Sequence, residues 1–258
     1  MQFAVCVVPT APMRKSPAHE SEMVNQLLFG ESMQVIETGS GNWTLVKTIP
    51  GNYEGWISKQ QIEAVNEEQA FADYAVIDNL NAMNEIQVDD LSMHIPFGSS
   101  LPGYKNGSGV IGVSSYKYSL SDVSPQSKLT TDRARLKLMI DTWVNAPYLW
   151  GGRTMLGVDC SGLTQVIFKM LGIDLLRDAS QQAQQGEVID FLQQAQLGDL
   201  AFFDDEAGKI YHVGILLSPD RIVHASGKVR IDSMDTAGIV NLQSGQRTHQ
   251  LRIIKRYF

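Results

Sequence analysis

The hydrophobic pattern of residues 1–65 consists of short runs in which apolar and polar positions alternate. Four runs are rich in β-branched and aromatic residues and are separated by turn-forming clusters. They are Phe3 to Val8, Met33 to Thr38, Trp43 to Thr48 and Gly55 to Ser58. Closely spaced short strands and turns are typical of small barrels, so we predict a β-barrel domain here.

The pattern of residues 66–128 is weaker. Residues 67–81 fit either a short helix or the approach to a strand, and strands are predicted at Leu91 to Gly98 and Gly112 to Leu120. A glycine-rich turn from Gly103 to Gly109 separates these two strands. We predict a second, degenerate barrel for this region, with a long elaborated linker as the alternative.

Helical spacing follows a polar linker that ends at Ser127. The apolar face of the first predicted helix consists of Leu136, Met139, Ile140, Trp143 and Val144, and its N-cap candidates are Thr130, Thr131 and Asp132. A second helix starts at Cys160, because apolar residues recur at helical spacing from Leu163 to Leu171. Gly172 then occupies the position of a C-terminal cap.

From Gly198 onward the pattern changes to strands. The predicted strands are Leu200 to Phe203, His212 to Leu217, Arg221 to Ala225, Lys228 to Asp232 and Leu251 to Tyr257. Helices followed by strands predict an α+β domain over residues 129–258, in which an antiparallel sheet carries the helices on one face.

Cys160 is a candidate nucleophile because the amides and partial positive charge of a helix start lower the pKa of a thiol. The alternative is a small buried core cysteine. A cysteine nucleophile needs a base, and the base needs an orienting partner. If the strands around His212 and His224 pair through their short turn, opposite residues have numbers that add up to about 438 and the two histidines lie close together. Because these histidines lack carboxylate or cysteine partners at ligand spacing, we expect no metal site and no cofactor.

Composition narrows the classes of partner and location. The net charge of −7 argues against nucleic acid and against an anionic membrane surface. The sequence has no run of about 18 apolar residues, so no transmembrane helix is expected. Two cysteines fit free thiols in a reducing compartment, and no leader is visible at the N-terminus. We expect a cytoplasmic monomer, or a periplasmic or secreted protein if a leader was removed.

Five motifs resemble those of the NlpC/P60 cysteine peptidases in order and spacing. They are Tyr148-Leu149-Trp150-Gly151-Gly152, Asp159-Cys160-Ser161-Gly162-Leu163, Gly198-Asp199-Leu200-Ala201-Phe202-Phe203, His212-Val213-Gly214-Ile215 and His224-Ala225-Ser226. The resemblance spans about residues 130–258 and implies a papain-like α+β domain that cleaves peptidoglycan peptides, usually between γ-linked D-glutamate and the diamino acid. It implies Cys160 as nucleophile, His212 as general base and His224 as the orienting third residue.

Residues 1–65 resemble a bacterial SH3-type module. The motifs are Met13-Arg14-Lys15-Ser16-Pro17, Phe29-Gly30-Glu31, Trp43 and Gly55-Trp56-Ile57. One clear and one degenerate SH3-type barrel before an NlpC/P60 domain resemble the γ-D-glutamyl-L-diamino acid endopeptidases of muropeptide recycling. This resemblance implies that the first module walls off the cleft, so that only peptides with a free N-terminal L-alanine fit and L-Ala-D-Glu is released.

The substrate contacts are expected from several residues. A buried ammonium needs an acceptor, and Asp159 is the best candidate, with Glu20 and Tyr53 as contributions of the first module. Ser161 and Ser180 are candidates for the D-glutamate carboxylate, Ser180 because helix starts bind anions. The alternatives are a plain N-cap for Ser180 and solvated loop residues for Glu20 and Tyr53.

Two aromatic residues of the first motif complete the expected substrate site. They are Tyr148, whose hydroxyl is a candidate oxyanion donor beside the Cys160 amide, and Trp150. The rival functions are a wall hydrolase that acts on intact peptidoglycan with the SH3-type modules as anchors, a non-catalytic muropeptide-binding protein, and an acyltransferase on the same core. The intact cysteine and histidines argue against the non-catalytic reading.

Overall fold

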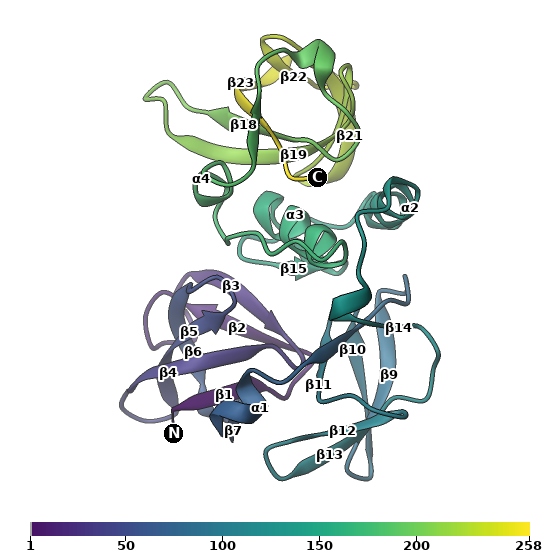
Figure 1. Cartoon of the computed structure of the whole chain (residues 1–258). Helices are drawn as coiled ribbons and strands as arrows, with labels where there is room; N and C mark the ends of the chain where they lie inside the picture. The colour runs from purple at the N-terminus through teal and green to yellow at the C-terminus, as the bar shows by residue number, and fades with distance from the viewer. Residues whose placement is uncertain (1) are drawn as a thin grey trace. The chain divides into compact units, whose positions relative to one another are not determined.

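The computed structural model describes residues 2–258, which form two compact units. The first unit extends to Leu129 and includes the segment Trp150–Met155, and the second comprises Thr130–Leu149 and Leu156–Phe258. Figure 1 labels the elements of both units by chain order. Among residues 2–258, no helix is both long enough and apolar enough to cross a membrane.

The first part of unit 1 is one antiparallel sheet of seven strands. They are β1 (Phe3–Cys6), β2 (Thr10–Arg14), β3 (Met23–Leu28), β4 (Ser32–Thr38), β5 (Trp43–Ile49), β6 (Glu54–Ser58) and β7 (Ile62–Val65), in the order β3-β2-β6-β5-β4-β1-β7. The sheet surrounds an apolar core that includes Cys6, Met33, Val46 and Ile57. The four predicted strands are confirmed, whereas β2, β3 and β7 were not predicted. β2 contains Pro12, which breaks a strand pattern in the sequence.

The second part of unit 1 begins with the short helix α1 (Glu67–Ala70), which Asn66 caps. Seven strands follow: β8 (Tyr74–Ile77), β9 (Met83–Val88), β10 (Leu91–Pro96), β11 (Ser100–Pro102), β12 (Ser108–Ile111), β13 (Ser114–Lys117) and β14 (Val123–Pro125). They form the sheets β10-β9-β13-β12 and β11-β8-β14. Val5 of β1 and Phe29, which follows β3 directly, belong to the same apolar core as these strands. Two sheets on a shared core favour a folded module over a linker, and its description as an SH3-type barrel stays a prediction.

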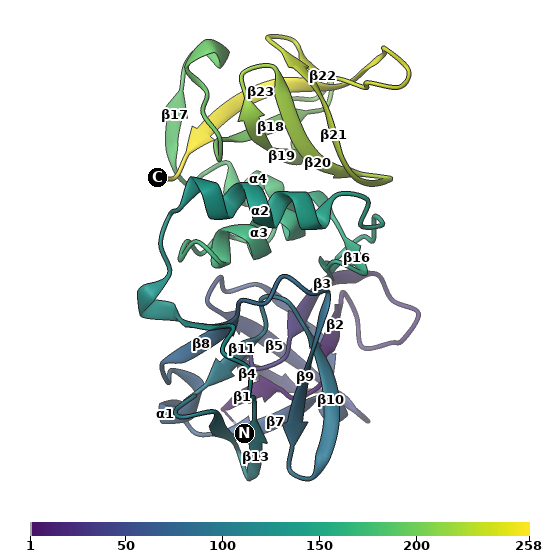
Figure 2. The same cartoon turned by 90° about the vertical axis from the view of Figure 1, so that its right-hand side faces the viewer.

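Unit 2 consists of three helices and a large antiparallel sheet. The helices are α2 (Arg133–Trp143), α3 (Cys160–Lys169) and α4 (Ala179–Gln182). The two-residue strand β16 (Gly157–Val158) precedes α3, and β15 (Arg153–Thr154) lies in the Trp150–Met155 segment of unit 1. The sheet contains β17 (Glu187–Ile189), β18 (Leu200–Asp204), β19 (Ile210–Ser218), β20 (Arg221–Ser226), β21 (Lys228–Asp235), β22 (Gly238–Val240) and β23 (Arg247–Arg256). Figure 2 shows α2 and α3 side by side along this sheet, and α3 packs on β19 and β20.

The sheet of unit 2 differs from the prediction in being closed. Its order is β17-β23-β18-β19-β20-β21-β22, and β22 pairs back onto β23. Strands β18 to β23 therefore form a ring, which Figure 1 shows end-on. Bulges in the β18–β23 and β22–β23 pairs bend the strands enough for this closure. The predicted order of helices followed by antiparallel strands is confirmed, and the papain-like description stays a prediction.

Helix caps and strand register place the candidate site. The Asp132 carboxylate accepts the Ala134 amide at 2.8 Å and caps α2, and the Asp159 carboxylate accepts the Gly162 amide at 2.7 Å and caps α3. Helix α3 ends as predicted, with Gly172 at a φ of 77°. Strands β19 and β20 pair with Gly214 opposite His224, which is the predicted register.

Candidate active site

Cys160 is the first residue of α3, directly after its cap Asp159. Its side chain is buried, and the backbone of Val213 on β19 hydrogen-bonds to its thiol. Val213 follows His212 directly, so the sulfur lies beside the strand that carries the predicted base. The amphipathic spacing of α3 turns its apolar face onto the sheet and thereby brings the helix start to this strand.

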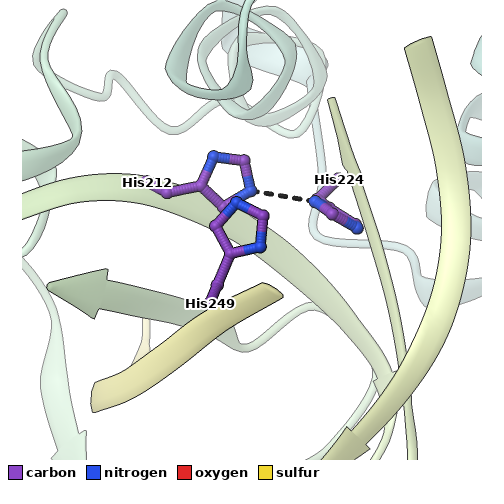
Figure 3. A group of neighbouring side chains, drawn as sticks. All are labelled: His212, His224 and His249. Atoms are coloured by element: carbon purple, nitrogen blue, oxygen red, sulfur yellow. Dashed lines mark hydrogen bonds between the residues drawn. The ribbon is translucent and has the colours of Figure 1, made fainter. Parts of the chain in front are cut away.

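A chain of hydrogen bonds connects His212 to a carboxylate through His224. His212 Nε2 lies 2.9 Å from His224 Nδ1, and His224 Nε2 lies 3.0 Å from Asp232 Oδ2 (Figure 3). A carboxylate only accepts, so His224 donates from Nε2 and accepts from His212 Nε2–H at Nδ1. Nδ1 of His212 then keeps its lone pair, as a general base requires. The relay fits the predicted roles of both histidines.

Asp232 was not among the sequence candidates. Its position on β21 is the diagonal neighbour of His224, because Arg230 lies directly opposite His224 in the β20–β21 register. Burial acts to raise the pKa of Asp232, but hydrogen bonds from His224 and the Leu242 amide and the charge of Arg230 outweigh it, and the pKa lies below its usual value. Asp232 therefore presents a stable carboxylate to His224.

His249 on β23 is the second residue that the sequence did not indicate. Its ring stacks on His212 with centroids 4.1 Å apart and an interplanar angle of 26° (Figure 3). The ring of Tyr211 also stacks on His249, with centroids 5.9 Å apart. A lone histidine in a polar stretch carries no signal of this contact, because the pairing of β23 with β18 and β22 places it there.

The pKa values describe a site that rests uncharged. Burial and the neighbouring Asp159 carboxylate raise the pKa of the Cys160 thiol to about 12, although hydrogen bonds from the backbone of Val213 and Ser161 act in the opposite direction. Burial, with His249 and His224 nearby, holds the pKa of His212 well below 6.5. The expectation that the helix start lowers the thiol pKa is therefore wrong for the resting site. Desolvation of the sulfur outweighs the helix amides.

A glycine sets the spacing of the two strands that carry the histidines. Gly214 lies opposite His224, and a β-carbon built on it would lie 2.9 Å from the Val223 carbonyl oxygen and 2.7 Å from Ile222 Cδ1. A larger residue would have to push β20 away from β19. The distance between His212 and His224 thus depends on the absence of a side chain at position 214.

Asp159 and Ser161 belong to a buried polar cluster with Arg177. Arg177 Nη2 lies 2.5 Å from Asp159 Oδ2, Nη1 lies 3.1 Å from Asp159 Oδ1, and Nη1 donates to Ser161 Oγ at 2.8 Å. These bonds give Arg177 a structural role beside the start of α3. The Asp159 carboxylate is paired with the Arg177 guanidinium and accepts a hydrogen bond from the start of α3. Its predicted contact with a substrate ammonium therefore has to compete with these bonds. That contact stays a prediction.

The other predicted substrate residues lie in different settings. Burial and the nearby charges of Cys160 and Asp159 raise the pKa of Tyr148, which therefore keeps its hydroxyl proton as a hydrogen-bond donor. In unit 1, Trp150 Nε1 donates to Glu22 Oε1 at 2.9 Å. The roles of Tyr148 and Trp150 toward substrate stay predictions.

Ser180 does not cap a helix. Asp178 is the N-cap of α4 and forms a capping box with Gln181, so the alternative reading of Ser180 is wrong. Helix α4 has four residues, which is too short for a substantial dipole at its start. Glu20 is exposed in a turn of unit 1, and Tyr53 packs at the edge of the first barrel core. Substrate contacts of these three residues stay predictions.

The histidines form a cluster that the spacing argument on metals did not foresee. Among residues 2–258, ligand atoms of His212, His224 and His249 lie within 4.8 Å of one another. The spacing argument considered neighbours along the sequence, whereas the three histidines lie on three different strands. Asp232 supplies the carboxylate partner that the sequence reading found lacking.

Comparisons with known proteins agree with this architecture. Residues 145–247 match the NlpC/P60 family, and residues 13–62 match the bacterial dipeptidyl-peptidase SH3 domain. A γ-D-glutamyl-L-lysine dipeptidyl-peptidase of Bacillus subtilis is 31% identical over 218 residues, covering 78% of this chain and 71% of the relative. A dipeptidyl-peptidase 6 of Lysinibacillus sphaericus is 25% identical, covering 90% and 92%.

A solved structure has the same fold over the whole length. It is an NlpC/P60 family protein from Bacillus cereus, with a TM-score of 0.81, 20% identity and coverage of 99% of both chains. The family match and the Bacillus subtilis relative indicate one family, and the solved structure has the fold expected for it. The chain therefore belongs to the NlpC/P60 peptidase family and carries an N-terminal bacterial dipeptidyl-peptidase SH3 domain.

Proposed function

We propose that this chain is a cysteine endopeptidase that cleaves the bond between γ-D-glutamate and the diamino acid in peptidoglycan-derived peptides with a free N-terminal L-alanine. The products are L-Ala-D-Glu and a peptide that starts with the diamino acid. The observation that carries the proposal is the hydrogen-bonded relay from Asp232 through His224 to His212, beside a cysteine at a helix start.

The first step forms an acyl-enzyme. Cys160 Sγ attacks the γ-carbonyl carbon of D-glutamate while its proton passes to His212 Nδ1. A thiol with a raised pKa and an imidazole with a lowered pKa rest uncharged, so the ion pair forms as the proton moves during the attack. His224 and Asp232 stabilise the imidazolium and hold its ring in the correct tautomer.

The oxyanion of the tetrahedral intermediate needs hydrogen-bond donors. The first amides of a helix have no partner within the helix, so the Cys160 amide is available to the oxyanion. The Tyr148 hydroxyl is the second proposed donor, because it stays protonated and its pKa responds to the charge of Cys160. The intermediate collapses when His212 gives its proton to the departing amine of the diamino acid.

The second step releases the dipeptide. His212 takes a proton from a water molecule that attacks the thioester carbonyl, and the C–S bond breaks as Cys160 regains a proton. Because water is the acyl acceptor, the products are two peptides with an unmodified carboxylate and amine. The Bacillus subtilis relative is named for the γ-D-glutamyl-L-lysine bond, and both it and the Lysinibacillus sphaericus relative are named dipeptidyl-peptidases, which supports cleavage at this bond with release of a dipeptide.

The test uses L-Ala-γ-D-Glu peptides that continue with either L-lysine or meso-diaminopimelate, each with a free and an N-acetylated alanine. Mass spectrometry should detect L-Ala-D-Glu from the free-amine peptides, and the N-acetylated forms should remain intact. The Cys160→Ala variant should leave all four peptides intact.

Two outcomes would contradict the proposal. Equal cleavage of acetylated and free peptides would remove the free-amine requirement, and release of peptides from intact peptidoglycan would favour a wall hydrolase. A recycling enzyme also has to meet its substrate in the cytoplasm, which we propose as the location. Detection of the chain outside the cytoplasm by cell fractionation would contradict that location.

A further inference from the structure

Three histidines from three strands converge within unit 2. His212 lies on β19, His224 on β20 and His249 on β23, and their ligand atoms all lie within 4.8 Å of one another. Figure 3 shows the ring of His249 against His212, and the dashed hydrogen bond between His212 and His224. The proposed hydrolysis uses His212 and His224 and leaves His249 without an assigned task.

The cluster has the chemistry of a transition-metal site. Neutral imidazole binds zinc, cobalt, nickel and copper, and three histidines with an open fourth position are an established ligand set for zinc. Ligand nitrogens of a tetrahedral site lie about 3.3 Å apart when the metal–nitrogen distance is about 2.0 Å. His212 Nε2 and His224 Nδ1 are 2.9 Å apart, so an ion between them needs a small separation of the rings.

A carboxylate holds His224, one of the three proposed ligands, in the orientation that a metal requires. Metal-binding histidines commonly donate their other N–H to a carboxylate. His224 Nε2 has this partner in Asp232 at 3.0 Å, which leaves the Nδ1 lone pair directed at the cluster. Arg230 lies 2.8 Å from the Asp232 carboxylate, so the negative charge of Asp232 balances the positive charge of Arg230 beside the cluster.

His249 is the ligand that has to move. It is stacked on His212 at 4.1 Å, whereas coordination uses the lone pair in the plane of each ring. Its side chain is half-buried and also contacts the rings of Tyr211 and Phe203, so coordination requires the His249 ring to rotate out of this stack. Its Nδ1 lies 2.8 Å from Thr248 Oγ1, and that contact leaves Nε2 as the ligand atom.

We propose that His212, His224 and His249 form a binding site for one divalent transition-metal ion, and that the bound ion reversibly switches off the peptidase. When His212 Nε2 takes the metal, its proton moves to Nδ1, so the ring stays neutral and no proton is lost. Nδ1 then carries a proton and cannot accept the one from Cys160. The switch rests on the proposed function, whereas the binding site does not.

The experiment measures binding without the thiol. The full-length Cys160→Ala variant is titrated with zinc by calorimetry and with cobalt by visible absorption, whose intense bands report tetrahedral coordination. We expect one ion per chain. Adding His249→Ala should weaken the affinity by at least about tenfold, the lower end of what loss of even an outer-shell partner costs. His94→Ala removes an exposed histidine of β10 and should leave the affinity unchanged.

Several results would overturn the inference. They are no binding to the Cys160→Ala variant at millimolar zinc, equal affinity with and without His249, or binding that requires Cys160 and therefore reports a thiol–imidazole pair. His249→Gln serves as a second variant if His249→Ala unfolds. A wild-type protein that hydrolyses muropeptides equally well with and without zinc would refute the switch, whereas a zinc-binding chain that hydrolyses none of the test peptides would refute the proposed function alone.

Discussion

The barrel core of unit 1 and the helix start of unit 2 each contain one buried free cysteine. Burial is the largest cause that raises the pKa of Cys6 and of Cys160, in both cases to about 12. The Cys6 thiol donates to the carbonyl of Val8 at 3.3 Å and lies 3.7 Å from that of Leu27. Its other neighbours are the apolar side chains of the barrel core.

The surroundings of Cys160 differ from those of Cys6 in offering a base for the thiol proton. The backbone of Val213 and Ser161 hydrogen-bonds to its sulfur, and the adjacent strand carries the His212–His224 relay. Backbone hydrogen bonds of Val8 and Ala11 likewise act to lower the pKa of Cys6, but the carbonyl oxygens that its thiol contacts are not bases that can take its proton. Both thiol pKa values are raised by burial, so we expect the two cysteines to differ in reactivity because only Cys160 has a histidine relay beside it to accept its proton.

The largest expected effect separates the two cysteines directly. Cys160→Ala should lower the rate of hydrolysis of L-Ala-γ-D-Glu-diamino acid peptides by about 10⁴-fold or more, because the nucleophile is lost. Cys6→Ala should retain the rate and lower the free energy of unfolding by about 1 kcal/mol, measured by urea titration. Comparable loss of activity in both variants, with both folded, would contradict the assignment of the nucleophile.

The second comparison concerns two buried arginines. Arg177→Met leaves the Asp159 carboxylate buried without its arginine, and we expect a loss of about 3–5 kcal/mol in the free energy of unfolding. Arg153→Met breaks the matching pair with Glu31 in unit 1, where Arg153 lies 2.7 Å from that carboxylate, and should cost a similar amount. Circular dichroism during urea titration measures both.

These two variants should differ in catalysis under conditions where both remain folded. Asp159 caps the helix that Cys160 begins, so Arg177→Met should also disturb the sulfur and lower kcat. Unchanged kcat in Arg177→Met would show that the cap holds without its ion pair.

The third comparison uses two aspartates of β21. Asp232→Asn weakens the partner of His224 and should lower kcat/KM by about 10–100-fold, a range typical of partners that orient a functional histidine. Asp235→Asn alters an exposed ion pair with Arg247 and should leave kcat/KM unchanged, with a loss of about 0–1 kcal/mol in stability. Equal kinetics of the two variants would remove Asp232 from the relay.

The smallest expected effect is the change of activity across neutral pH. His212 must be unprotonated to accept the proton of Cys160, so activity is lost as pH falls through the pKa of His212. Burial holds that pKa well below 6.5, and the thiol pKa is about 12. We therefore expect kcat/KM to vary little between pH 6.5 and pH 9, and an acid limb near pH 6.5 would contradict the buried neutral imidazole.

Local signals in the sequence were sufficient for the cysteine helix and for the pairing of the two histidine strands. The start of α3 followed from the apolar spacing after Cys160, and the short turn between His212 and His224 determined their register. Both features depend on residues close together in the chain. For the same reason the four strongest strands of the first barrel were predicted with small errors at their ends.

The parts that were missed depend on strand pairing that the local pattern does not specify. Strands β18, β20 and β21 were predicted, but the register that brings Asp232 beside His224 was not, and the predicted last strand began at Leu251, after His249. Closure of the sheet likewise depends on the pairing of β22 with β23, which the local pattern does not specify. Desolvation of Cys160 likewise results from the packing of α3 on the sheet, which explains why the helix start alone gave the wrong direction for its pKa.

The missing side chain at Gly214 restricts how this chain can vary. Any other residue there would push the backbone of Val223, and no compensating change of a side chain elsewhere can restore a separation that backbone atoms define. If position 214 is randomised and active variants are selected, we expect almost all of them to carry glycine, even though residue 214 takes part in no chemical step. Selection for glycine at position 214 would therefore reflect the spacing of β19 and β20, and it would not identify the substrate.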